Sequence, residues 1–397
     1  MSLKKNLLAL TATATLALYA APAAALKIEL INVGGVTAGT DIHKGFTQAA
    51  RFWEKALTND VTVRLEVNYA ALGAGVIGST GSTTNVSYVG PLLDALRSAG
   101  NSKLDSIARD SLVASRASGF VGGQAVDALI SAPKANGNGV NTSPLTRVLD
   151  ADAGANNSAF SANTSLLKAL GITPTYTGAA ATNQRDGIVT FSSNFAFDFD
   201  PTNGIDAGKM DFLGVAIHEI GHALGFRSGV DTYDGNTNLG ANLGNFAIMS
   251  VWDLFRYSEE SADQGVRDWA IGGNPFFSID GGQSIYDGDA FMATGRNFGD
   301  GRQASHWKDA HSGDPQLGVM DPTSAFGQQQ YIDSLDLAAF DAMGWNVAYD
   351  VMWLNERRFS TAELVNIDTF AVPEPGMLAL SLAAVGLMGI ARRRKAG

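Results

Sequence analysis

The sequence predicts an α+β fold. The chain has 397 residues, which is enough to bury a large core in one or two domains. It opens with a strand, a helix and a second strand, judged by the periodicity of its apolar residues. Another strand and a strongly apolar helix follow near the middle. We therefore treat residues 26–371 as one two-lobed domain between two terminal segments.

The first three elements follow from residue spacing. Residues 26–33 predict a first strand, and residues 61–69 alternate apolar and polar side chains as a half-buried strand does. Between them, residues 41–57 repeat with the period of a helix. The apolar side chains of this helix fall on one face: Phe46, Ala49, Ala50, Trp53 and Leu57.

A glycine-rich stretch follows the second strand. Gly73-Ala-Gly75-Val-Ile-Gly78 matches the glycine pattern of dinucleotide-binding loops. That pattern requires the last glycine to begin a helix, whereas the polar residues 79–84 follow here. We therefore interpret residues 73–78 as a flexible turn.

The next segments are less regular. Residues 91–99 and 102–113 have short helical patterns. Residues 135–162 are rich in Asn, Ala, Ser and Gly, and they predict a long surface loop with one helix-like piece at 145–149.

The second half of the chain begins with a strand at residues 188–191 and 195–197, which ends in a stretch containing Asp, Pro and Gly. A helix over residues 211–224 follows. A segment rich in Gly, Asn and Asp then extends to about residue 305. A helix near residues 334–343 ends the domain.

The two ends predict export. Two lysines, an apolar stretch and small residues up to Ala25 give residues 1–25 the layout of a secretory signal peptide. At the other end, Pro373-Glu374-Pro375 precedes a short apolar run and a basic cluster. Residues 372–397 resemble the PEP-CTERM sorting signal of Gram-negative bacteria.

This resemblance implies a protein at the cell surface or in the extracellular space, and an exosortase-type enzyme that removes the tail. The apolar run, residues 377–391, is shorter than the roughly 20 residues of a stable membrane span. It therefore predicts a short anchor helix that holds the chain at the inner membrane only transiently. A plain tail anchor is the alternative.

The composition excludes several kinds of site and partner. The chain has no cysteine, which excludes disulfides, thiolate zinc ligands and cysteine nucleophiles. Its formal net charge is −11 at pH 7. This charge argues against nucleic acid and against an anionic membrane surface as partners.

The helix predicted at residues 211–224 carries the run His218-Glu219-Ile-Gly-His222. Histidines four residues apart lie on one face of a helix, so two neutral imidazoles can bind one Zn²⁺. Glu219 is then placed to act on a water that the metal activates. The apolar neighbours predict a buried helix, and Gly225 predicts its end at a positive-φ cap. A buried helix whose histidines only form hydrogen bonds is the alternative.

A catalytic zinc takes a third protein ligand and keeps one position open. The chain has five histidines, and the three outside the helix are His43, His306 and His311. In metzincin proteases the third histidine stands six residues after the second. Here that position is Ser228, so the ordinary metzincin completion fails.

A second set of residues lies downstream, where His306-Trp307 is followed by Met320-Asp-Pro322. Together with the His-x-x-Gly-Phe end of the helix, they resemble the leishmanolysin branch of the metzincins. In that branch an insertion separates the helix from a His-Trp pair with the third ligand, and a Met-turn with the sequence Met-x-Pro follows. The matching motifs span residues 211–322.

The resemblance implies a metzincin-like fold with a mixed, twisted sheet beside the active-site helix. It implies that His306 is the third zinc ligand and that Met320 forms the floor beneath the metal. The region 191–197 resembles the edge strand that holds substrate in such enzymes. The lack of cysteine departs from leishmanolysin itself, which is rich in disulfides.

Other ligand sets remain open. His311 lies in a loop with Gly and Pro and is the rival third ligand, although a solvated loop histidine is its simpler interpretation. His43 is interpreted as a residue that caps or decorates the first helix. An acidic third ligand from elsewhere in the chain is a further alternative.

These observations predict a secreted or surface-sorted zinc metalloendopeptidase. Glu219 would take a proton from the attacking water and return it to the leaving amine of a protein or peptide substrate. The alternatives are a non-catalytic matrix or surface protein with the same fold, and a zinc-dependent amidohydrolase that acts on non-peptide substrates. Acidic, glycine-rich turns could also supply oxygen ligands to Ca²⁺, at Asp280, Asp287, Asp289 and Asp300.

Overall fold

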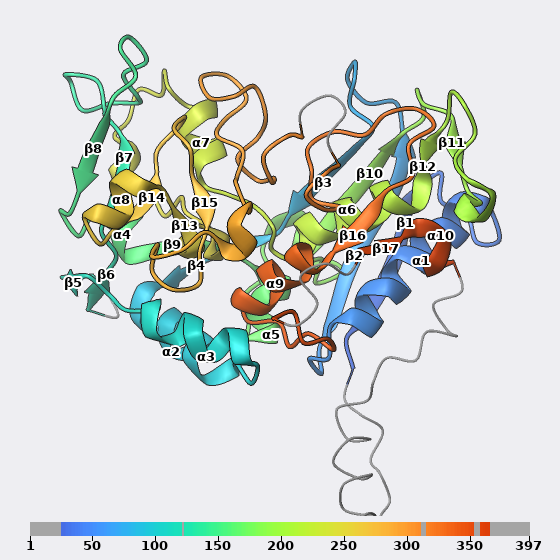
Figure 1. Cartoon of the computed structure of the whole chain (residues 1–397), viewed down its shortest axis with the longest axis horizontal. Helices are drawn as coiled ribbons and strands as arrows, with labels where there is room; N and C mark the ends of the chain where they lie inside the picture. Colours follow the sequence, from blue (N-terminus) through green and yellow to red (C-terminus); the bar gives the residue numbers. More distant parts are fainter. Residues whose placement is uncertain (1–24, 121–122, 311–314, 353–357, 366–397) are drawn as a thin grey trace, which may run out of the picture.

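A computed structural model describes residues 25–120, 123–310, 315–352 and 358–365 (Figure 1). The predicted signal peptide, apart from Ala25, and the predicted sorting segment lie outside the described residues. Within the described part, helices and several small sheets are mixed, which confirms the α+β class. No helix in these ranges combines the length and the apolar character needed to cross a bilayer.

The largest sheet has four strands in the order β1-β2-β10-β3. Strands β1 (Lys27–Gly34), β2 (Thr62–Ala70) and β10 (Gly187–Ser192) run parallel to one another. Strand β3 (Gly78–Ser82) pairs antiparallel with β10 and forms one edge. The turn predicted at residues 73–78 is confirmed up to Val76, and a strand follows it rather than the helix of a dinucleotide site.

Helices α1 (Asp41–Ala56) and α6 (Phe212–Leu224) pack against each other and against this sheet (Figure 1). The apolar face predicted for α1 is buried. The Trp53 indole on α1 donates a hydrogen bond to the Ile217 carbonyl on α6, with a distance of 3.0 Å. Burial of a large apolar side chain stabilises a fold by about 1.5–3 kcal/mol, and Trp53 is fully buried. Its packing and its hydrogen bond therefore hold α1 and α6 together in the core.

The prediction for residues 135–162 is wrong. Instead of one surface loop, this segment contains β8 (Arg147–Asp150), the short helix α4 (Ala155–Ser158) and β9 (Ala159–Asn163). The helix-like piece at 145–149 lies mostly in β8. Composition was misleading at Asn156, Asn157 and Ser158, whose side chains are buried. Asn157 donates a hydrogen bond to the Val126 carbonyl at 2.9 Å.

The segment rich in Gly, Asn and Asp also folds into short elements. They form the left half of Figure 1, together with α2 (Val89–Ala99) and α3 (Lys103–Ser111), which the sequence predicted. The elements of this segment are α7 (Val230–Gly235), η3 (Leu243–Asn245), η4 (Val251–Phe255), β13 (Arg256–Tyr257), α8 (Glu259–Asp263), β14 (Arg267–Trp269), β15 (Phe276–Phe277) and η5 (Tyr286–Gly288).

Small sheets join distant parts of the chain. Strand β14 pairs with β7 (Ala128–Ser131), which also pairs with β8, and β9 pairs with β4 (Thr84–Tyr88). The remaining elements are β5 (Arg116–Ala117), β6 (Gln124–Ala125), α5 (Thr164–Ala169), η1 (Gly178–Ala181), β11 (Phe197–Asp198), η2 (Pro201–Asn203), β12 (Met210–Asp211), β16 (Tyr331–Asp333), α9 (Ser334–Ala342), β17 (Arg358–Ser360) and α10 (Thr361–Leu364).

Candidate metal centre

Helix α6 forms where the sequence predicts it. The Asp211 side chain caps its start by accepting a hydrogen bond from the Gly214 N–H at 3.1 Å. Gly225, with φ of 130°, ends it, as the sequence predicted. All its residues are buried except His218 and His222, which are half-buried and one turn apart.

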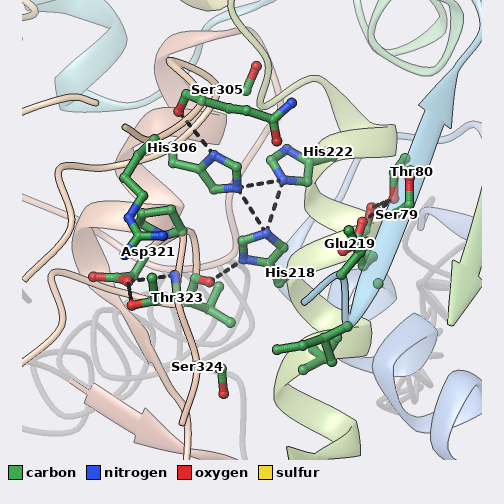
Figure 2. Close-up of a pocket in the computed structure, with 18 of the residues that line it drawn as sticks. Ser79, Thr80, His218, Glu219, His222, Ser305, His306, Asp321, Thr323 and Ser324 are labelled. Atoms are coloured by element: carbon green, nitrogen blue, oxygen red, sulfur yellow. Dashed lines mark hydrogen bonds between the residues drawn. The ribbon is translucent and has the colours of Figure 1, made fainter. Parts of the chain in front are cut away.

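The structure brings these two histidines together with His306. The Nε2 atoms of His218 and His222 are 3.0 Å apart, and His306 Nε2 lies 3.2 Å from each of them. Figure 2 shows the three rings converging on one point. In the described part of the chain, this is the one group of three or more His, Cys, Asp or Glu side chains with metal-ligand spacing.

The other ring nitrogens determine the tautomers. His218 Nδ1 lies 2.7 Å from the Val319 carbonyl, and His222 Nδ1 lies 2.6 Å from the Phe226 carbonyl. His306 Nδ1 likewise lies 3.1 Å from a backbone carbonyl, that of Gln303. A carbonyl oxygen only accepts, so each Nδ1 must carry the proton. In the neutral rings, the three Nε2 lone pairs therefore face one another.

The environment keeps the rings neutral. Burial lowers the pKa of His218 to about 4 and that of His222 to about 3, and it lowers the pKa of His306 well below its usual value. Three lone pairs that converge at about 3 Å in a buried place repel one another unless a cation lies between them.

The spacing fits zinc. In a tetrahedral site with bonds of about 2.0–2.1 Å, the ligand nitrogens lie about 3.3–3.4 Å apart. The observed separations of 3.0–3.2 Å are close to this value. In such a site the three imidazoles would occupy three corners of the tetrahedron, and one corner would be left for water or substrate.

The two ends of the long segment between α6 and His306 are bonded to each other. Ser228, at the position where the metzincin pattern has a histidine, donates its backbone N–H to Ser305 Oγ at 2.8 Å. The Asp231 carboxylate accepts hydrogen bonds from the Ala304 and Ser305 N–H groups at 2.7 and 3.1 Å. These bonds close the segment between Ser228 and Ser305 into a loop, so the next residue, His306, reaches the two helix histidines.

Met320 packs against helix α6 at Gly221. It is fully buried, and a Cβ atom at Gly221 would lie 2.7 Å from its sulfur. Gly221 stands between the two helix histidines, so its missing side chain lets Met320 pack closely against α6. The Trp307 N–H donates to the Met320 carbonyl at 3.1 Å. The His-Trp and Met-x-Pro segments are therefore held against each other, and both contact α6.

Sequence reasoning missed Asp336 on α9, which organises these segments. Its fully buried carboxylate accepts hydrogen bonds from Trp307 Nε1 at 2.9 Å and from the Val319 and Met320 N–H groups at 2.8 and 3.2 Å. A fourth comes from the Asp333 N–H at 2.9 Å. Asp336 thus links Trp307, the neighbour of His306, to Val319, whose carbonyl accepts a hydrogen bond from His218 Nδ1. The signal available in the sequence was an acidic residue within the apolar pattern of the helix predicted near residues 334–343.

We expect Asp336→Asn to lower the free energy of unfolding by about 2–4 kcal/mol, because the amide nitrogen turns toward N–H donors and leaves them unpaired. Burial raises the pKa of Asp336 to about 7, so urea unfolding is compared well above that pH, where the carboxyl is ionised. The same substitution at the exposed Asp60 is the control. Equal stability of the two variants would contradict this role.

Glu219 lies beside the histidines on the side of β3 (Figure 2). Thr80 Oγ1 is 2.7 Å from Glu219 Oε2 and 2.8 Å from the Glu219 carbonyl. Burial raises the pKa of Glu219 to about 7, and the hydrogen bond from Thr80 opposes that rise. A Cβ atom at Gly78 would lie 2.6 Å from Glu219 Oε1, so only glycine leaves room for the carboxylate there.

The prediction of the edge strand is wrong. Residues 188–191 lie in β10, which pairs with β2 on one side and β3 on the other. Phe191 is fully buried against Phe46 and Phe212, with ring centroids 4.8 and 4.6 Å apart. After β10 ends at Ser192, residues 193–196 belong to no strand, and Phe197 begins the separate strand β11. The edge strand beside the histidines is β3.

A cavity of about 800 Å³ joins these parts. Strand β3 forms one wall, and the segment after Met320 forms the opposite wall (Figure 2). His218, Glu219, His222 and His306 line it together. The arrangement places three converging histidines, a buried carboxylate and an edge strand along one cleft.

The remaining predicted site residues lie elsewhere. His43 is in the first turn of α1, where its N–H donates to the Thr40 hydroxyl, and it is not part of the histidine group. His311 lies outside the described residues. The carboxylates of Asp280 and Asp300 accept hydrogen bonds from neighbours in their own turns, Asp280 from Ser284 and Asp300 from Arg302.

One comparison with known proteins gave a match. Residues 371–395 match the PEP-CTERM protein-sorting motif. This motif indicates export to the cell surface or extracellular space of a Gram-negative bacterium and processing by an exosortase-type enzyme. No curated protein and no solved structure gave a significant match to the chain.

Proposed function

We propose that this exported protein is a zinc-dependent endopeptidase of the leishmanolysin-like metzincin type. The observation that carries the proposal is the convergence of three Nε2 lone pairs. In each ring a backbone carbonyl accepts a hydrogen bond from Nδ1, so the proton is on Nδ1 and the lone pair is on Nε2. His218, His222 and His306 would hold the ion. Zinc bound there would polarise a water and the scissile carbonyl as a Lewis acid.

Glu219 is the group that moves protons in this proposal. Its carboxylate lines the cavity next to the helix histidines and has a pKa raised to about 7. A carboxylate with such a pKa takes a proton from water and returns it to a leaving amine near neutral pH. The hydroxyl of Thr80 donates a hydrogen bond to Glu219 Oε2. This contact fixes the orientation of the carboxylate and therefore the position of its second oxygen, Oε1.

Strand β3 supports a peptide as the substrate. It pairs with β10 on one side only, and its residues Gly78, Thr80 and Ser82 line the cavity. An edge strand offers unpaired N–H and C=O groups to an extended peptide, which then adds a strand to the sheet. This geometry favours a peptide over small non-peptide amides, which have no backbone to pair with β3.

The proposal is tested by incubating the purified chain with casein and with a peptide library. We expect cleavage that stops when a zinc chelator is added and returns when zinc is restored, because without the ion nothing at the three histidines would polarise the water and the scissile carbonyl. A panel of small non-peptide amides is the comparison. Cleavage of those amides alone would contradict the peptidase proposal, and cleavage of neither class by the zinc-loaded chain would contradict hydrolysis altogether.

A further inference from the structure

A second group of ligand-type oxygen atoms lies away from the histidines, in the loop between β8 and β9. The sequence there is Asp150-Ala-Asp152-Ala-Gly154-Ala-Asn156, so three side chains with oxygen atoms lie within seven residues, with Gly154 between the second and the third. This loop faces the turn η3 from the long insertion, with which α4 is in contact.

Oxygen atoms from both segments surround Gly154. A Cβ atom on Gly154 would lie 2.7 Å from Asp152 Oδ1, 3.2 Å from Asn156 Oδ1 and 3.3 Å from the Gly244 carbonyl oxygen. A Cβ atom on Gly244 would lie 3.2 Å from Asn242 Oδ1 and 3.6 Å from the same Asn156 Oδ1. The Asp152 and Asn242 oxygens also accept hydrogen bonds from the Gly154 and Gly244 N–H groups, at 2.6 and 2.9 Å. Each glycine thus leaves an open position with oxygen atoms around it, and Asn156 Oδ1 lies near both positions.

Asn156 shows that this space takes a ligand. The residue is fully buried, and its Oδ1 has no hydrogen-bond partner in the described part of the chain. Its Nδ2 donates to Asp150 Oδ2 at 2.6 Å and lies 3.2 Å from the Tyr233 hydroxyl. These contacts fix the orientation of the amide, so Oδ1 must point toward the open positions beside Gly154 and Gly244. A buried, unpaired amide oxygen is costly unless a cation or a donor meets it.

Two carboxylates stand beside this space. Asp152 is exposed and accepts a hydrogen bond from the Gly154 N–H at 2.6 Å, and Asp150 is buried and accepts one from Asn156 Nδ2. Among the residues that the structure describes, no ion pair includes either of them. A cation at this place would be attracted to both carboxylates.

We propose that these residues form a calcium site, with ligands from Asp152, Asn156, Asn242 and the Gly244 carbonyl, and with Asp150 as the second carboxylate. A set made only of carboxylate, amide and carbonyl oxygens is the donor set of Ca²⁺ rather than of zinc. Two carboxylates predict an affinity of about 10⁻⁴–10⁻³ M, as in other extracellular calcium modules. The sorting motif places the chain in a compartment where such a site can fill.

The ion would tie the long insertion to the strand that supports α6. Helix α4 leads directly into β9, and Asn163 at the end of β9 donates to the His222 carbonyl at 3.0 Å. Calcium would therefore stabilise the whole fold while leaving the zinc ligands themselves unchanged.

The test uses the zinc-loaded full chain and titrates CaCl₂ by calorimetry. We expect one Ca²⁺ per chain, a rise in Tm of about 2 °C or more at saturation, and at least about tenfold weaker binding in Asp152→Asn. Gly154→Ala keeps every carboxylate but fills the space, and it should weaken binding as well. Asp110→Asn removes an exposed carboxylate elsewhere and should bind calcium as the unchanged chain does.

Terbium luminescence gives a second measurement, since Tyr233 lies against Asn156 and should sensitise a bound Tb³⁺. Calcium should displace it from the unchanged chain. The proposal is overturned if the unchanged chain binds no Ca²⁺, or if Asp152→Asn and Asp110→Asn bind it equally. Neither measurement depends on hydrolysis, so failure of this site and failure of the proposed peptidase function are distinguishable.

Discussion

We expect Glu219→Gln to retain zinc and to lower peptide hydrolysis by about a hundredfold or more. General acid–base catalysis contributes about 10²–10⁴-fold, and glutamine keeps the shape of the side chain but accepts no proton. Its amide oxygen can still meet the hydroxyl of Thr80, which now contacts Glu219 Oε2 at 2.7 Å. The substitution therefore removes the proton transfer with little change to the wall of the cavity.

The measurement is kcat/KM on a peptide that the unchanged chain cleaves, together with zinc content. Glu259→Gln is the matched control, because Glu259 is an exposed glutamate on α8. Full activity of Glu219→Gln would sink the assignment of Glu219. Loss of zinc from this variant would make Glu219 part of the metal site instead of the proton-transfer group.

The second large effect is expected from His306→Ala. Replacing residues that only orient a ligand typically costs 10–100-fold in metal affinity, so losing a ligand should cost more than about a hundredfold. Hydrolysis should fall with it. The control is His311→Ala, because His311 is the rival third ligand in the sequence. Competition with a zinc-sensitive dye gives both affinities.

Zinc affinity that falls in His311→Ala and not in His306→Ala would reverse the assignment. A fall in both would indicate that the segment after His306 folds only when both histidines are present. Circular dichroism of each variant separates that case from ligand loss, since helix content would drop as well.

Helix α6 could be predicted from the sequence because every signal for it is local. The apolar frame, the histidine spacing and Gly225 all act within one stretch of chain. His306 required a resemblance, since nothing in the spacing of the chain indicates that Ser228 and Ser305 meet. The hydrogen bond between these two residues, at 2.8 Å, is a tertiary contact.

The edge strand could not be predicted for a different reason. Strand β3 has the sequence Gly-Ser-Thr-Gly-Ser, which has no strand propensity, and it forms because β10 pairs with it. Strand β10 carries the apolar pattern instead, but Phe191 serves the core. Asn156 was missed similarly, because buried Asn in an Asn-rich stretch reads as a solvated loop.

The most direct test of the three-histidine centre is zinc-edge X-ray absorption on the unchanged chain and on the two histidine variants. We predict three imidazole nitrogens and one further light ligand at about 2.0–2.1 Å in the unchanged chain and in His311→Ala. His306→Ala should show two imidazoles. An unchanged imidazole count in His306→Ala, or four protein ligands in the unchanged chain, would contradict the centre described for His218, His222 and His306.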